Sequence, residues 1–79
     1  DRRTQELKEE NRRLAYLRFL VDLALWEIRS GRRSLAEAQQ IVDNVRAQAL
    51  KLFPGKETAF EIIYQPRFRR AINETYRLH

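Results

Sequence analysis

The chain has 79 residues, a formal net charge of +5 and 43% apolar residues, with no cysteine and one histidine. A domain of this length buries only about 60–65% of the surface that its unfolded chain exposes, so its core is small. The absence of cysteine excludes disulfides, thiolate metal sites and cysteine nucleophiles. The composition is that of one folded helical domain over residues 1–79 and not of a disordered tail.

Residues 4–29 are predicted to form the first helix. Leu, Ala, Arg and Glu are frequent there, and no Gly or Pro interrupts the segment. Gly31 follows, at the position where helices often end in a left-handed residue. The first helix is therefore expected to end near Arg29, whereas the polar residues 1–6 are expected to fray.

The second helix is predicted over residues 35–53. Its start is marked by Ser34 and Glu37, the spacing of a capping box, in which each side chain bonds the backbone amide of the other residue. Its end is marked by the pair Pro54-Gly55, which cannot continue a helix.

The third helix is predicted over residues 58–78, with an interruption at Pro66. Thr58 and Glu61 repeat the capping-box spacing at its start. Pro66 lacks an amide hydrogen and crowds the preceding turn, so the helix is expected to kink or break there.

The first two helices differ in how much of their circumference is apolar. On the second, the apolar residues occupy an arc of about 120°, as in an ordinary outer helix of a bundle. On the first, they occupy roughly 240° and form two seams. One seam has the heptad spacing of Leu7, Leu14, Leu17, Val21, Ala24 and Ile28. The other consists of Tyr16, Phe19, Leu20, Leu23 and Trp26.

Two shorter helices can cover one seam of the first helix and part of the flank of the next, which leaves apolar surface over. Leaving four large apolar side chains exposed would cost about 6–12 kcal/mol, which is comparable to the whole stability of a small domain. We therefore expect an all-α three-helix bundle that assembles as a homodimer through the second seam. Two alternatives are complete coverage of the first helix within a monomer and docking to a different protein.

The sequence does not indicate catalysis. The two serines have no histidine beside them in the sequence, and the only histidine is His79 at the last position, where no fixed base can be built. No spacing typical of a metal site is present, and the two glycines cannot form a phosphate-binding loop. We expect no enzyme activity, no bound metal and no cofactor.

Basic residues are the remaining candidates for function. Thirteen of the 16 Lys and Arg residues are Arg, and Phe68 stands among those that follow Pro66. Candidate contacts to a polyanion are Arg32, Arg33, Arg67, Arg69 and Arg70.

The sequence thus favours a non-catalytic interaction or structural module that self-associates, and a small basic nucleic-acid-binding protein is the alternative. No membrane span is expected, because the most apolar stretch, residues 14–28, contains three charges. A chain without cysteine fits the reducing cytoplasm.

Overall fold

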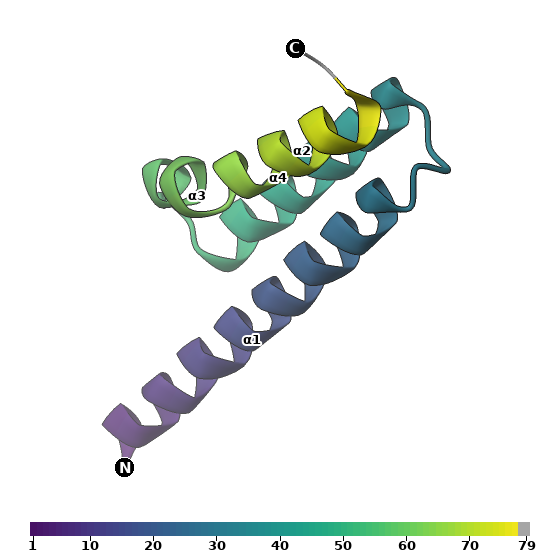
Figure 1. The fold of residues 1–79 in the computed structure, drawn as a ribbon. Coiled ribbons are helices and arrows are strands. Elements are labelled where there is room, and N and C mark those ends of the chain that lie inside the picture. The colour runs from purple at the N-terminus through teal and green to yellow at the C-terminus, as the bar shows by residue number, and fades with distance from the viewer. Residues whose placement is uncertain (78–79) are drawn as a thin grey trace.

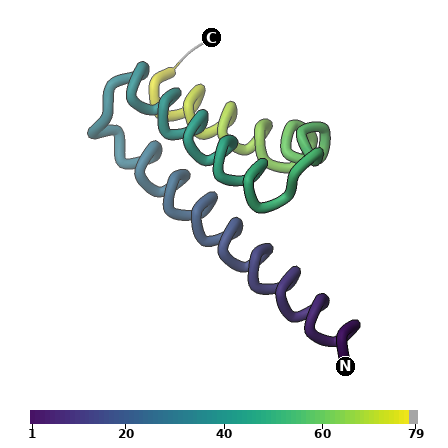
Figure 2. Tube along the Cα trace, turned by 180° about the vertical axis from the view of Figure 1, so that it is seen from behind, coloured from purple at the N-terminus to yellow at the C-terminus, as the bar shows by residue number. Residues whose placement is uncertain are grey.

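A computed structural model describes residues 1–77, and this part of the chain contains four α-helices. They are α1 (Arg2–Arg29), α2 (Leu35–Leu52), α3 (Glu57–Ile63) and α4 (Gln65–Tyr76). Helices α2 and α4 pack on the C-terminal half of α1, and the short α3 lies at the end of the bundle (Figure 1). The N-terminal half of α1 projects beyond them, as the view from behind also shows (Figure 2). The prediction of an all-helical fold is confirmed.

Helix α1 begins earlier than the sequence predicts. The Asp1 carboxylate accepts a hydrogen bond from the backbone amide of Arg3 (3.2 Å) and caps the first turn. Arg2 and Glu6 form an exposed ion pair (3.5 Å) one turn apart. The structure thus continues α1 through residues 2–6, where the sequence predicts fraying, and a cap and a run of good helix formers support this extension.

The connection between α1 and α2 follows the sequence prediction closely. Gly31 has a left-handed backbone (φ 72°), and its amide donates to the carbonyl of Ile28 (3.2 Å), as expected after a helix C-terminus. The Glu37 amide donates to the Ser34 hydroxyl (3.1 Å), and the Ser34 amide donates to the Glu37 carboxylate (3.0 Å). The first capping box is thus confirmed.

The predicted third helix is two helices. Tyr64 is at once the last cap of α3 and the first cap of α4, and Pro66 is the second residue of α4, where its missing amide hydrogen costs no helical bond. The break near Pro66 is confirmed, but the capping box at Thr58 is wrong. Helix α3 begins at Glu57, one residue earlier, with Lys56 as a cap that forms no side-chain hydrogen bond. The predicted end at residue 78 lies outside the described residues.

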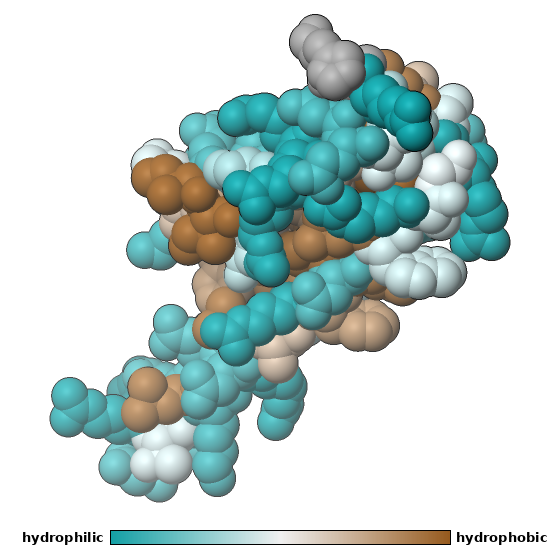
Figure 3. All heavy atoms as spheres, in the orientation of Figure 1, coloured by the Kyte–Doolittle hydropathy of each residue, from teal (hydrophilic) through white to brown (hydrophobic). Residues whose placement is uncertain are grey.

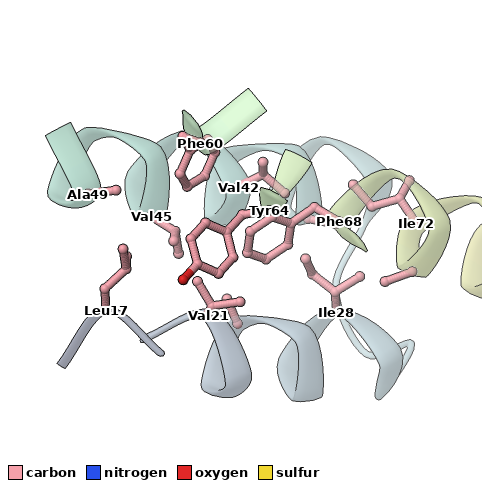
Figure 4. Close-up of a cluster of buried hydrophobic side chains, with 13 residues drawn as sticks. Leu17, Val21, Ile28, Val42, Val45, Ala49, Phe60, Tyr64, Phe68 and Ile72 are labelled. Atoms are coloured by element: carbon pink, nitrogen blue, oxygen red, sulfur yellow. The ribbon is translucent and has the colours of Figure 1, made fainter. Parts of the chain in front are cut away.

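The core is formed by one face of each helix (Figure 4). Phe60 and Phe68 stack at 6.4 Å between ring centroids, and Tyr64 lies 5.7 Å from Phe60. In the close-up, the rings of Tyr64 and Phe68 lie between side chains of α1 and α2, and the ring of Phe60 lies beside α2. The first seam of α1 is buried where the bundle covers it, at Leu17, Val21, Ala24 and Ile28, whereas Leu14 is half-buried and Leu7 is exposed.

We expect the substitution Phe68→Ala to reduce the free energy of unfolding by about 3–5 kcal/mol, because this ring is completely buried and would leave a cavity. Urea denaturation monitored by helical circular dichroism measures the loss. The control is Ile62→Ala on α3, whose side chain is 70% exposed and which should cost less than about 1 kcal/mol. Equal losses at the two positions would contradict the packing described here.

Candidate functional site

The second seam of α1 is uncovered. The exposed fractions are 49% for Tyr16, 59% for Phe19, 48% for Leu23 and 63% for Trp26, and Leu20 is half-buried. We call these five residues the aromatic face. At 100° per residue, its four exposed members point about 150° away from the buried residues of α1. Complete coverage of α1 by its own chain, one of the alternatives left open by the sequence, is therefore wrong for residues 1–77.

Charged side chains border the aromatic face at its C-terminal end. The guanidinium of Arg32 lies 5.5 Å from the centre of the Trp26 ring, within reach of a cation–π interaction. Glu27, on the flank of α1 beside the aromatic face, accepts two hydrogen bonds from Arg33 (2.6 and 3.0 Å). This bond with Glu27 raises the pKa of Arg33. Arg32 and Arg33 are thus held at the edge of the aromatic face.

Helix α4 fixes this edge from the other side. The hydroxyl of Tyr76 donates to the backbone carbonyl of Arg33, and Arg29 of α1 forms an ion pair with Glu74 (2.8 Å). The end of α4 therefore holds the α1–α2 connection in place, although the contacting groups are exposed.

The five arginines proposed as polyanion contacts do not form one surface. Arg67 lies beside Arg18 and Asp22 of α1, with which it lines a shallow depression. Arg69 points about 160° away from Arg67 around α4 and lies beside Asp43 of α2. Arg32 and Arg33 lie at the opposite end of α4, next to Tyr76. The structure thus brings Arg32 and Arg33 together but separates them from the arginines of α4.

A second apolar surface was not predicted from the sequence. It is a groove of about 290 Å³ at the corner where α1 leaves the bundle, and a brown patch marks the α3 end of the molecule in Figure 3. Ile63, which lines the groove, and its neighbour Ile62, which does not, are both exposed. The adjacent pair Ile62-Ile63 could have predicted an apolar surface here, because a short helix cannot bury both side chains on one face. The lining residues are Leu14, Leu17, Ala49, Leu50, Phe53, Lys56, Ala59, Phe60, Ile63 and Tyr64.

Comparisons of the chain with protein-family models, curated proteins and solved structures found no match. Within residues 1–77, no three potential metal ligands among His, Cys, Asp and Glu come together. In the same range, every helix is too short or too polar to span a bilayer.

The capping box beside the aromatic face gives a prediction about pH. The hydrogen bond from the Ser34 backbone lowers the pKa of Glu37 below its ordinary value of 4.5. The ionised carboxylate therefore stabilises the fold above that value, and this stabilisation is lost as the pH falls through the lowered pKa. The urea midpoint of Glu37→Gln should lie below that of the unmodified protein at pH 7, and the gap should shrink toward pH 3.

The control is Glu10→Gln, on the exposed projecting part of α1. Its urea midpoint should stay close to that of the unmodified protein at both pH values. A gap for Glu37→Gln that is the same at pH 7 and pH 3 would contradict the role of the ionised carboxylate.

Proposed function

We propose that the protein is a non-catalytic interaction module that associates with a second copy of itself through the aromatic face. The observation that carries this proposal is that four large apolar side chains lie exposed in one stripe, on the side of α1 opposite to the core. Tyr, Trp and Phe are enriched at the centres of protein interfaces, where they supply much of the binding energy.

The size of the aromatic face supports a modest interface. A large aromatic side chain offers about 150–250 Å², so four half-exposed side chains present about 400 Å². A standard interface buries about 800 Å² per partner, so flanking side chains such as Arg12, Glu27 and Arg32 must supply the other half. A polar rim around an apolar centre is the usual anatomy of such interfaces.

A second copy is the favoured occupant of this face. An apolar stripe on a helix can pair with the same stripe of another copy around a two-fold axis, the commonest symmetry of soluble oligomers. Because the aromatic face points away from α2 and α4, the two bundles would lie on the outer sides of the α1 pair and would not collide. We place this assembly in the cytoplasm, for which the absence of cysteine is the only support.

Sedimentation equilibrium over a range of concentrations is expected to show a dimer for the unmodified protein. The double variant Phe19→Asp/Trp26→Asp should be a folded monomer, because it places charges on exposed positions of the face and leaves the buried seam intact. Circular dichroism checks the folding.

The control is Ile62→Asp, which places one aspartate on a more exposed apolar position of α3 and should leave the dimer unchanged; Phe19→Asp alone is the variant of equal charge. A monomer at every concentration of the unmodified protein would overturn self-association. A dimer that persists in the double variant would show that another surface, such as the groove beside Ile63, mediates it.

Nucleic-acid binding is the second candidate function, with two of the five predicted arginines as the contacts. Arg67 and Arg70 are exposed about 60° apart on α4, and neither forms an ion pair within residues 1–77. Two free guanidinium groups can contact successive phosphates.

If α4 binds nucleic acid, fluorescence anisotropy with random-sequence duplex DNA and RNA should detect binding at low salt that weakens as salt rises. The double variant Arg67→Gln/Arg70→Gln should bind more weakly, with a smaller salt dependence. The control Arg2→Gln/Arg3→Gln removes the same charge from the far end of α1. No binding at low salt, or equal losses in the two variants, would exclude a specific role for α4.

A further inference from the structure

We infer that the crevice between α1 and the junction of α3 and α4 binds a single-chain anionic amphiphile of the fatty-acid type. The hydrocarbon chain of this ligand lies in the apolar groove beside Ile63, and its carboxylate meets Arg18, Arg67 and the hydroxyl of Tyr64. Binding there does not depend on self-association. Arg18 points about 120° away from the centre of the aromatic face, and the groove lies farther round α1.

The apolar groove and the shallow depression beside Arg67 are consecutive parts of one crevice. Ile63 and Tyr64 line both of them. On α1, Arg18 of the depression follows Leu14 of the groove by one helical turn, and on the other wall Arg67 follows Ile63 by four residues. A ligand that fills the groove and extends by one more turn, about 5 Å, therefore reaches the level of both arginines.

The groove favours a hydrocarbon chain. Among the ten described residues that line it, Lys56 is the only charged one. Its volume of about 290 Å³ lies at the lower end of the range of small-ligand pockets and fits one alkyl chain of moderate length. One turn of an α-helix, about 10 Å across and about 5 Å long, occupies more space than this. The groove therefore suits a single chain better than a helix of a partner protein.

The hydroxyl of Tyr64 is a polar group at the point where the two parts of the crevice meet. The Tyr64 side chain is only 9% exposed, and its oxygen points toward α1 between Leu17 and Val21 (Figure 4). Within residues 1–77 this oxygen forms no hydrogen bond. Since no unpartnered side-chain oxygen of that range is fully buried, the hydroxyl is open to the crevice. It is free to donate a hydrogen bond to a carboxylate.

The charges of the depression match one carboxylate. Arg18 and Arg67 are exposed at its rim, and neither forms an ion pair within residues 1–77. Asp22 lines the same depression, so two arginines and one aspartate leave one net positive charge. A carboxylate neutralises this charge and accepts hydrogen bonds from guanidinium groups. A doubly charged phosphate group would leave an excess of negative charge beside Asp22.

Lys56 is the alternative contact for the carboxylate. It is exposed at the N-cap of α3, two turns before Ile63. One ammonium group provides fewer donors in a fixed geometry than two guanidinium groups and a hydroxyl. The carboxylate is therefore assigned to the end of the crevice at Arg67.

Methyl NMR of the isotope-labelled protein tests the site by titration with sodium decanoate, kept below its micelle-forming concentration. The signals of Leu14 and Ile63 should shift and saturate, whereas that of Leu23 on the aromatic face should not move. Octanoate, which is shorter by two methylenes, should bind about four- to fifteenfold more weakly. The absence of a saturable shift at Ile63, or shifts confined to the aromatic face, would overturn the proposal.

Two adjacent isoleucines provide a matched pair of variants for the groove. Ile63→Asp should weaken decanoate binding at least about tenfold, because it places a charge against the hydrocarbon chain. Ile62→Asp makes the same change on a side chain that is also exposed but does not line the groove, and it should leave binding unchanged. Equal losses in the two variants would overturn the groove as the site.

The position of the carboxylate has its own test. Arg67→Gln should weaken decanoate binding about two- to fivefold, the range of an exposed ion pair, and should leave the binding of uncharged decanol unchanged. The control Arg69→Gln removes the same charge from the flank of α4 that faces α2 and should have no effect. A loss with Lys56→Gln and none with Arg67→Gln would overturn the proposed orientation of the ligand.

Discussion

The structure depends on a difference in apolar surface: α1 has two apolar sides, whereas each helix that packs on it has one. Helix α1 is apolar over most of its circumference in residues 14–28, whereas α2 and α4 each bring one apolar face. They bury the seam that contains Val21 and Ile28, and no other helix of the described chain reaches the opposite side. The exposed aromatic side chains follow directly from this geometry, since a helix with two apolar sides needs cover on both.

Features that depend on local sequence were predictable. The end of α1 at Arg29, before the left-handed Gly31, and the capping box at Ser34 each require only a few neighbouring residues, so the sequence specifies them without knowledge of the packing. The same holds for the break near Pro66, which follows from a missing amide hydrogen. The exposure of the aromatic face was also predictable, because counting the apolar arc of α1 against the helices available to cover it needs no coordinates.

Features that depend on tertiary packing were not predictable. The capping box predicted at Thr58 is absent, and the carboxylate of Glu61, its expected partner, instead accepts a hydrogen bond from Arg46 of α2 (3.1 Å). The groove near Ile63 arises where three helices meet, so the residue pattern of no single segment predicts it. The separation of Arg67 from Arg33 likewise depends on how α4 packs over the bundle, which the local sequence around each arginine does not specify.

Trp26 is the only tryptophan of the chain, and it stands in the aromatic face with Arg32 over its ring. Its indole is mostly in contact with solvent, while the tyrosine closest to the centre of the core, Tyr64, is buried. In the native protein, tryptophan fluorescence therefore reports on this one surface. Its emission wavelength responds to whatever covers that surface, without any label and independently of the interior of the bundle.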